Sequence, residues 1–325
     1  SLVKRKIIRK TEKFCRISSA IMQYMEEEIM EIRFEERKQL KEKPDQKHLG
    51  FGKYMTDYMF IMDWDKDQGW HDARIVPQGP IELDPACVTL HYAQETFEGM
   101  KAYRTAEGKI QLFRPEMNAK RMINSNARLC MPEFPVDMFV EAVEALVKVE
   151  ADWVPSEPNT SLYIRPFMFA TEAALGVHMA NAYKFMIICC PVGAYYAAGL
   201  NPVKILVEDE LVRAVKGGTG FTKCGGNYAG SILGQVKAEK LGYAQVLWLD
   251  GEHRKYVEEV GTMNIMFKIA GEIYTAPIEG TVLPGVTRDS MIHLLRDWGY
   301  KVNETRLSVD DLMKAGHDGT LEEVF

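Results

Sequence analysis

A segment dense in proline and glycine, residues 191–202, divides this chain into two stretches that each mix short apolar segments with amphipathic ones. It reads Pro-Val-Gly-Ala-Tyr-Tyr-Ala-Ala-Gly-Leu-Asn-Pro, a composition typical of a linker between domains. At 325 residues the chain is long enough for two domains. We therefore predict an α/β (α+β) protein with a charged extension at 1–47, a smaller α+β domain at 48–190, the linker at 191–202, and a larger domain at 203–325.

Hydrophobic periodicity predicts the elements of each domain. For the first domain we expect strands at 58–64, 88–92, 110–113, 161–166 and 184–190, with helices at 117–129 and 137–149. For the second we expect strands at 203–207, 244–249, 263–269 and 272–275, with helices at 227–241 and 288–298. Residues 25–47 are dense in Glu and Lys, which indicates a solvated helix or arm.

Charge and cysteine content exclude several classes of protein. The net charge of −6 argues against a nucleic-acid-binding protein, which would usually carry a basic face. The six cysteines are scattered without a Cys-x-x-Cys pair, so we expect neither a disulfide framework nor a metal site, and a reducing compartment fits. The longest apolar run, 185–200, contains Pro191 and is too short for a membrane span. A cytoplasmic protein without nucleic-acid or membrane partners is expected.

The first 24 residues carry seven Lys and Arg side chains against the single acidic Glu12, and the chain begins with Ser1. A basic targeting segment is one interpretation, and it would make a mitochondrial location possible. Upstream or vector-derived sequence is the other, which we favour because Met22 and Met25 precede a more typical start.

A single lysine, Lys223, lies between two glycine pairs in the segment Gly-Gly-Thr-Gly-Phe-Thr-Lys-Cys-Gly-Gly-Asn-Tyr at 217–228. Glycines on both sides let the backbone take positive-φ turns and approach a bound molecule closely. Such a loop suits a buried amine that meets a flat ligand. A glycine-rich surface loop with a solvated lysine is the alternative, and this stretch alone favours it.

Several other segments carry groups that could bind an anion or a cationic ring. The run Leu-Pro-Gly-Val-Thr-Arg at 283–288 begins a predicted helix, whose free N–H groups could hold a phosphate unless Thr287 is simply its N-cap. Arg114 follows two apolar residues and precedes a proline, so it could bind a phosphate or form a structural salt bridge. Glu259 could face a protonated ring nitrogen, whereas we expect Glu258 to be a solvated strand end.

A phosphate anchor, a ring-nitrogen carboxylate and a buried lysine are together the parts that a pyridoxal phosphate site requires. A lysine of this kind binds the cofactor's aldehyde and then moves a proton during the reaction. Desolvation would lower the pKa of its amine, as that role needs. The combination therefore favours an enzyme that uses pyridoxal 5'-phosphate.

Six strings of this sequence resemble, in order and spacing, the branched-chain amino acid aminotransferases. These are fold-type IV pyridoxal phosphate enzymes with a two-domain, D-amino acid aminotransferase-like architecture. The resemblance runs from about Gly50 to the last residue. The strings are Leu-His-Tyr-Ala-Gln-Glu-Thr-Phe-Glu-Gly-Met-Lys-Ala-Tyr at 90–103, Leu-Phe-Arg-Pro at 112–115, Thr-Ser-Leu-Tyr-Ile-Arg-Pro at 160–166, Gly-Gly-Asn-Tyr at 225–228, Glu-Val-Gly-Thr-Met-Asn at 259–264 and Leu-Pro-Gly-Val-Thr-Arg at 283–288.

The resemblance implies a role for each matched residue and makes the second domain the cofactor-binding one. Lys223 becomes the Schiff-base lysine, Glu259 the partner of the pyridine nitrogen and Tyr228 the partner of the phenolic oxygen. The phosphate would be held by Arg114 and the backbone at Val286 and Thr287, with Thr262 near the ring. Walls of an apolar substrate pocket are implied for Tyr92, Phe97, Tyr163 and Tyr195.

The implied reaction is a ping-pong transamination in a homodimer. Leucine, isoleucine and valine react with 2-oxoglutarate to give 2-oxo acids and glutamate. Tyr163 and Arg165 alternate with apolar residues and should project from one face of a strand. Arg165 is implied to help accommodate the distal carboxylate of glutamate.

The sequence departs from the family pattern at several places. Residues 55–59 read Met-Thr-Asp-Tyr-Met where Phe-Thr-Asp-His-Met is common, Ala93 replaces a frequent glycine, and Glu95 and Thr96 replace an apolar pair. Relatives continue after a Val-Phe like that at 324–325 into a Gly-x-Gly-Thr turn, so we expect a truncated C-terminal end. The alternatives are a D-amino acid transaminase or aminodeoxychorismate lyase of the same fold, or an inactive fragment that serves in binding or dimerisation.

Overall fold

The computed structural model describes residues 30–193 and 201–325. Contacts divide the chain into a short unit, Ser1–Glu31, and a long unit, Ile32–Phe325. All elements named below belong to the long unit. Within the described ranges, every helix is too short or too polar to cross a membrane.

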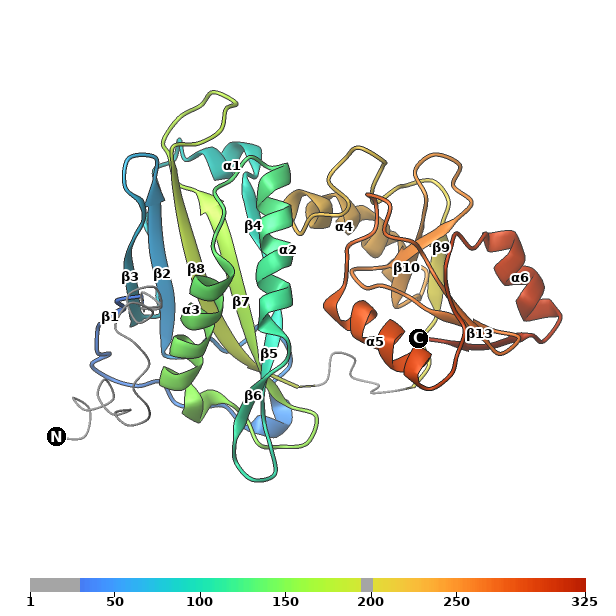
Figure 1. Ribbon diagram of the computed structural model, residues 1–325, viewed down its shortest axis with the longest axis horizontal. Helices are drawn as coiled ribbons and strands as arrows, with labels where there is room; N and C mark the ends of the chain where they lie inside the picture. The colour runs from blue at the N-terminus through green and yellow to red at the C-terminus, as the bar shows by residue number, and fades with distance from the viewer. Residues whose placement is uncertain (1–29, 194–200) are drawn as a thin grey trace, which may run out of the picture. The chain divides into compact units, whose positions relative to one another are not determined.

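An eight-stranded sheet forms the first half of the long unit, in the order β1-β3-β2-β8-β7-β5-β6, with β4 also paired to β7 (Figure 1). All of its pairs are antiparallel except β1 with β3. Its strands are β1 (Arg33–Phe34), β2 (Tyr58–Asp65), β3 (Gly69–Pro77), β4 (Glu95–Phe97), β5 (Met100–Arg104), β6 (Ile110–Leu112), β7 (Ser161–Ala170) and β8 (Ala182–Val192).

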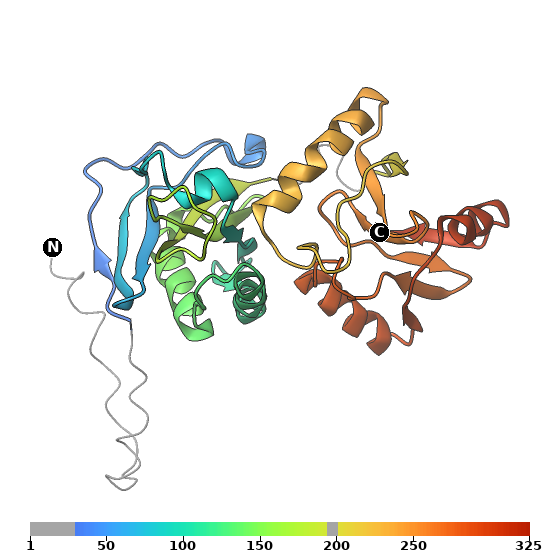
Figure 2. The same cartoon turned by 90° about the horizontal axis from the view of Figure 1, so that it is seen from above.

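Two helices, α2 (Pro115–Arg128) and α3 (Val136–Val149), lie against one face of this sheet (Figures 1 and 2). In α3, Phe139, Val143 and Leu146 are fully buried, and their spacing of four and three residues places them on one side of the helix. Contacts of α3 with β2, and of α2 with β4, close the core. This half also contains the short 3-10 turns η2 (Gln46–His48) and η3 (Ala151–Trp153).

The second half contains two smaller sheets. A three-stranded sheet has the order β11-β10-β9, and a four-stranded sheet has the order β14-β13-β12-β15. The strands are β9 (Ile205–Glu208), β10 (Gln245–Leu249), β11 (Val257–Val260), β12 (Phe267–Ile269), β13 (Glu272–Thr275), β14 (Val302–Glu304) and β15 (Leu321–Val324). The helices are α4 (Gly225–Lys240), α5 (Val286–Asp297) and α6 (Val309–His317).

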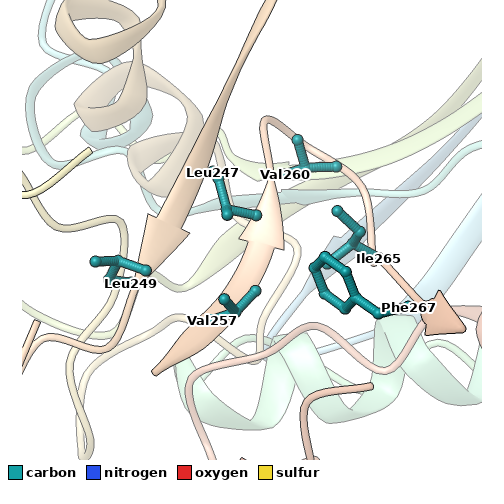
Figure 3. Close-up of a cluster of buried hydrophobic side chains, with 6 residues drawn as sticks. All are labelled: Leu247, Leu249, Val257, Val260, Ile265 and Phe267. Carbon is teal, nitrogen blue, oxygen red and sulfur yellow. The ribbon is translucent and has the colours of Figure 1, made fainter. Parts of the chain in front are cut away.

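A buried apolar cluster joins these two sheets (Figure 3). Leu247 and Leu249 lie on β10 and Val257 and Val260 on β11, and they form one cluster with Ile265 and Phe267. Each of the six is at most 8% exposed. Because β11 lies in this cluster, the two glutamates in its middle are fixed at buried positions.

One local prediction was wrong. Residues Val88–Tyr92 form a short helix, α1, rather than a strand. An apolar run of this length suits either element, and Ala93 ends the helix in the left-handed conformation with its N–H bonded to the carbonyl of Thr89. For 25–47 the sequence allowed a solvated helix or arm; the described part, from residue 30, contains β1 and η2 but no α-helix and is mostly exposed, which fits the arm.

Candidate active site

Lys223 lies directly before α4, and its amine points to a tyrosine on the first turn of that helix. The Lys223 Nζ donates a hydrogen bond of 2.8 Å to the Tyr228 Oη, and it lies 4.5 Å from the centre of the Phe97 ring. The backbone of Lys223 is held on both sides, because its N–H donates to the Ser125 Oγ and its carbonyl accepts from the Phe97 N–H, each at 2.9 Å. Helix α2 and strand β4 of the eight-stranded sheet therefore fix the backbone of the lysine together.

Burial sets the ionisation of this amine. Desolvation lowers the pKa of Lys223 to about 8, while the charge of Glu98 raises it and the charges of Arg121 and Arg165 lower it. Burial also raises the pKa of the Tyr228 hydroxyl, which stays protonated at neutral pH. About a tenth of the amine is therefore uncharged at pH 7, far more than in a solvated lysine, and the uncharged form is the nucleophile.

Glu259 occupies a buried position on β11 and is fully bonded there. Its Oε2 lies 3.0 Å from the Arg213 Nε, and its Oε1 accepts from the Leu283 N–H at 2.9 Å and from the Asn264 amide at 3.1 Å. Burial raises the pKa of this carboxyl, and Arg213 opposes that effect. A carboxylate held in this way can stabilise a protonated ring nitrogen beside it.

Glu258, expected as a solvated strand end, is buried instead and only 8% exposed. Its Oε1 accepts a hydrogen bond from the Thr281 hydroxyl, and burial raises the pKa of its carboxyl. The prediction was wrong because β11 is covered on both faces, so all four of its residues are buried, whichever face they point to.

A cavity of about 560 Å³ opens in front of Lys223. It is lined by residues from both halves of the long unit, among them Arg121, Tyr163, Lys223, Thr262, Val286 and Thr287. A second, small pocket is lined by Arg213, Tyr228, Glu259 and Thr262, so that Thr262 borders both spaces. The structure thus brings together the predicted lysine, carboxylate, tyrosine and helix start.

The start of α5 presents free backbone donors to the cavity. Its N-cap is Gly285, in an extended conformation and without a side-chain cap. Thr287 is therefore inside the first turn and not the N-cap. The N–H groups of Val286 and Thr287 belong to the first turn, where the helix itself supplies no partner and the positive end of the dipole favours an anion.

Arg114 forms a salt bridge, which was the alternative to phosphate binding that the sequence left open. Arg114 has φ 50° at the start of α2, and its guanidinium bonds to Asp289 at 2.8 Å and to Ser290 at 2.6 Å on α5. It is not among the residues that line the cavity, whereas Arg121 is. Arg121 was missed by sequence reasoning.

The position of Arg121 on its helix is seen only in the structure. It lies three residues after the buried Asn118 and four before the buried Ser125, which places it on the inward face of α2. A charged residue on a buried helix face is rarely without a partner or a function. The partner of Arg121 is Glu98, which lies 23 residues away along the chain.

The predicted substrate-pocket residues are distributed unevenly. Tyr163 lines the cavity, and the Arg165 Nη2 donates to its hydroxyl at 2.9 Å, which confirms that the two project from one face of β7. The guanidinium of Arg165 stacks 4.6 Å from the Phe97 ring. Tyr92 is 41% exposed, bonds to the carbonyl of Leu175, and does not line this cavity. Tyr195 lies outside the described residues.

These residues fit pyridoxal 5'-phosphate. The observation that decides the fit is the combination of a buried amine of lowered pKa with an uncapped helix start and a buried arginine on the same cavity. The amine suits the cofactor's aldehyde, and the helix start and arginine suit its phosphate. The buried carboxylate of Glu259 suits its ring nitrogen.

Comparisons with known proteins agree with this chemistry. A family model described as "Amino-transferase class IV" matches residues 95–317. A "Probable branched-chain-amino-acid aminotransferase" of Staphylococcus epidermidis is 55% identical over 295 residues, which cover 90% of this chain and 82% of the relative. "Branched-chain-amino-acid transaminase 1" of Bacillus subtilis is 54% identical over 286 residues, which cover 88% of this chain and 80% of the relative.

Solved structures show the same architecture. The branched-chain amino acid aminotransferase of Escherichia coli superposes with a TM-score of 0.66 at 25% identity, over 83% of this chain and 81% of that one. The branched-chain amino acid aminotransferase of Thermobaculum terrenum, solved "in PLP-form (holo-form)", superposes with a TM-score of 0.63 at 25% identity, over 77% of this chain and 77% of that one.

Proposed function

Because this chain belongs to the class IV aminotransferases, and within them to the branched-chain-amino-acid aminotransferases, we propose that it exchanges amino groups between branched-chain L-amino acids and 2-oxoglutarate. Leucine, isoleucine and valine are the proposed donors, and the products are the matching 2-oxo acids and L-glutamate in a ping-pong cycle. The observation that carries the proposal is the buried amine of Lys223, 2.8 Å from the Tyr228 hydroxyl at the edge of the large cavity.

Pyridoxal 5'-phosphate is the proposed cofactor, and it would supply an electron sink that makes the α-proton of the amino acid acidic. Lys223 would hold it through the aldehyde, Glu259 would face its ring nitrogen and Tyr228 its phenolic oxygen. Thr262 would lie near the ring. Support comes from the buried positions of the lysine and the glutamate and from similar proteins whose structures contain the cofactor or its pyridoxamine form.

We assign the phosphate to Arg121 and the first turn of α5, because these groups share the cavity with Lys223. The sequence pointed to Arg114, and the geometry supports a different task for that residue. Its bonds to Asp289 and Ser290 tie the start of α2 to α5, so Arg114 would support the phosphate site from behind.

Lys223 would also move a proton at the α-carbon of the substrate. An amine with a pKa of about 8 can release and accept a proton near neutral pH, which suits general acid–base catalysis. Tyr228 accepts the hydrogen bond of the lysine and so directs the amine along one line. Without the desolvation that lowers its pKa, the lysine would be almost entirely protonated at neutral pH.

The substrate pocket would be walled by aromatic and apolar side chains, with Arg165 at its edge for the distal carboxylate of glutamate. Phe97 and Tyr163 pack around the guanidinium of Arg165, which supports this arrangement. One pocket could then accept an apolar side chain and an acidic one in turn. Roles for Tyr92 and Tyr195 at this pocket remain proposals, as do the homodimer, the cytoplasmic location and the domain limits at 48–190 and 203–325.

The test is spectroscopic. Pyridoxal 5'-phosphate added to the purified protein should give a visible chromophore that borohydride reduces and leucine bleaches, and Lys223→Ala should form none. Coupled assays with leucine and 2-oxoglutarate should then release glutamate. A wild-type protein that forms no chromophore, or one that only D-alanine converts, would overturn the proposal; the D-amino acid alternative is not favoured by relatives about 55% identical.

A further inference from the structure

One carboxylate to which the proposed function assigns no task is among the most deeply buried charges in the described residues. Glu98, between β4 and β5, is fully buried. Its Oε1 accepts from the Arg121 Nε at 2.8 Å, and its Oε2 accepts from the Arg121 Nη2 at 2.7 Å and from the Asn118 amide at 2.8 Å. Both oxygens are therefore engaged, and Arg121 is bound at two points in the fork geometry that guanidinium groups favour.

A third contact restrains the same guanidinium. The Arg121 Nη1 donates to the Pro284 carbonyl at 3.2 Å, directly before the N-cap of α5. The side chain of Arg121 is only 10% exposed. Of its five N–H groups, three have these partners, which leaves two for a ligand in the cavity.

We propose that Glu98 is a positioning residue, which holds Arg121 in the one orientation that directs its free N–H groups at the phosphate of the cofactor. This inference rests on the proposed function. A fully buried carboxylate carries a large desolvation penalty, and removing its charge would leave the arginine free to turn toward other acceptors. Partners behind a ligand-binding group commonly determine its affinity, because they fix its geometry before the ligand arrives.

A purely structural brace is the competing explanation. The pair joins the turn before β5 to α2, and breaking it could loosen the whole site. The two explanations differ in whether the loss of ligand affinity depends on the phosphate group of the ligand. A positioning role predicts a loss specific to ligands that carry a phosphate, whereas a loosened site would bind every ligand of the cavity less well.

The experiment compares pyridoxal 5'-phosphate with pyridoxal, which lacks the phosphate. Dissociation constants for both are measured by tryptophan fluorescence on the apoprotein, for the wild type and for Glu98→Gln. We expect the constant for pyridoxal 5'-phosphate to rise about 10- to 100-fold and that for pyridoxal to stay within about twofold. Equal weakening of both ligands, or no change in either, would overturn the inference.

A matched control is Glu150→Gln, which removes another carboxylate that is only 1% exposed but bonds to the Tyr58 N–H instead. It should leave the ratio of the two constants unchanged. If Glu98→Gln fails to fold, Glu98→Asp keeps the charge on a side chain that is one methylene shorter. The preference for pyridoxal 5'-phosphate over pyridoxal should then fall by a smaller factor. An unchanged preference contradicts the proposal. A wild type that does not distinguish the two ligands refutes the proposed function itself.

A second readout needs no cofactor. The charge of Glu98 favours the protonated form of Lys223, so Glu98→Gln should lower the pKa of that amine below its wild-type value of about 8. A merely loosened site would admit water and raise the pKa instead. The pH dependence of chemical labelling at Lys223, followed by mass spectrometry in the apoprotein, separates the two directions.

Discussion

At the scale of single residues, the chemistry of this site depends on which charges are buried together. Lys223 has lost most of its contact with water, and its nearest polar partner is the neutral hydroxyl of Tyr228. Glu98 and Arg121 are a pair whose opposite charges act on the lysine in opposite directions. Desolvation therefore dominates, and it lowers the pKa of the amine well below the ordinary value for lysine.

The lowered pKa of Lys223 predicts how fast the apoprotein takes up its cofactor at different pH values. Only the uncharged amine can attack the aldehyde, so the initial rate of chromophore formation should rise about tenfold per pH unit up to about pH 8 and then level off. Stopped-flow absorbance measures this rate. For comparison, Nα-acetyl-lysine should show a rise that continues to about pH 10; the same continued rise in the protein would mean that the amine is solvated.

At the scale of elements, α4 shows how a helix is fitted between a catalytic loop and a sheet. At its first residue, Gly225, a Cβ would collide with the Glu95 carboxylate, which accepts the Gly225 N–H. At Gly234 a Cβ would lie 2.5 Å from the Trp248 ring, which is 1% exposed on β10. At Gly230 a Cβ would meet nothing within 4 Å. Gly225 and Gly234 thus have steric reasons to be small, whereas Gly230 has none.

Two alanine substitutions in α4 should therefore have opposite effects on stability. Gly234→Ala forces its methyl group against Trp248, and we expect a loss of about 1–3 kcal/mol in the free energy of unfolding. Gly230→Ala gains helix propensity without a clash, and we expect a gain of about 0.5–1 kcal/mol. Urea unfolding followed by circular dichroism compares them. Similar effects of the two changes would show that α4 does not pack closely on Trp248.

At the scale of the whole molecule, one buried carboxylate makes stability depend on pH. Glu150 follows α3 and accepts the N–H of Tyr58 at the start of β2. Burial raises the pKa of its carboxyl from 4.5 to about 7. Between about pH 4.5 and 7, the folded state binds the proton of Glu150 more tightly than the unfolded state does. The free energy of unfolding therefore falls as the pH rises from about 4.5, and this loss is complete above about pH 7.

Glu150→Gln should remove this pH dependence. The shift corresponds to an upper limit of about 3 kcal/mol, so above pH 7 the variant should be more stable than the wild type by about 1–3 kcal/mol. Near pH 4.5 the difference should vanish. Urea unfolding at several pH values between 4.5 and 8 gives both curves, and parallel curves would mean that Glu150 is ionised throughout in the folded protein.

Local sequence determined a large part of this site. The spacing from Lys223 to Tyr228 crosses one helix start, so the loop and the first turn of α4 were enough to bring the amine and the hydroxyl together. Val286 and Thr287 likewise followed from one helix start after a Pro-Gly pair. The segments 58–64, 161–166 and 184–190 lie in β2, β7 and β8, because their apolar runs are long and bounded by turns.

Tertiary structure decided what local patterns leave open. The helix at 88–92 ends at a local cap, Ala93, and Leu90 and Tyr92 stay exposed. Glu258, in contrast, became buried because residues distant in sequence, such as Thr281, cover it. Contacts between residues distant in sequence also place Arg121, and not Arg114, at the cavity. Glu98 is 23 residues from Arg121 and Pro284 is 163 away. Contacts across such separations depend on how the two halves pack. No short window of sequence contains both Arg121 and its partners, so local patterns could not predict them.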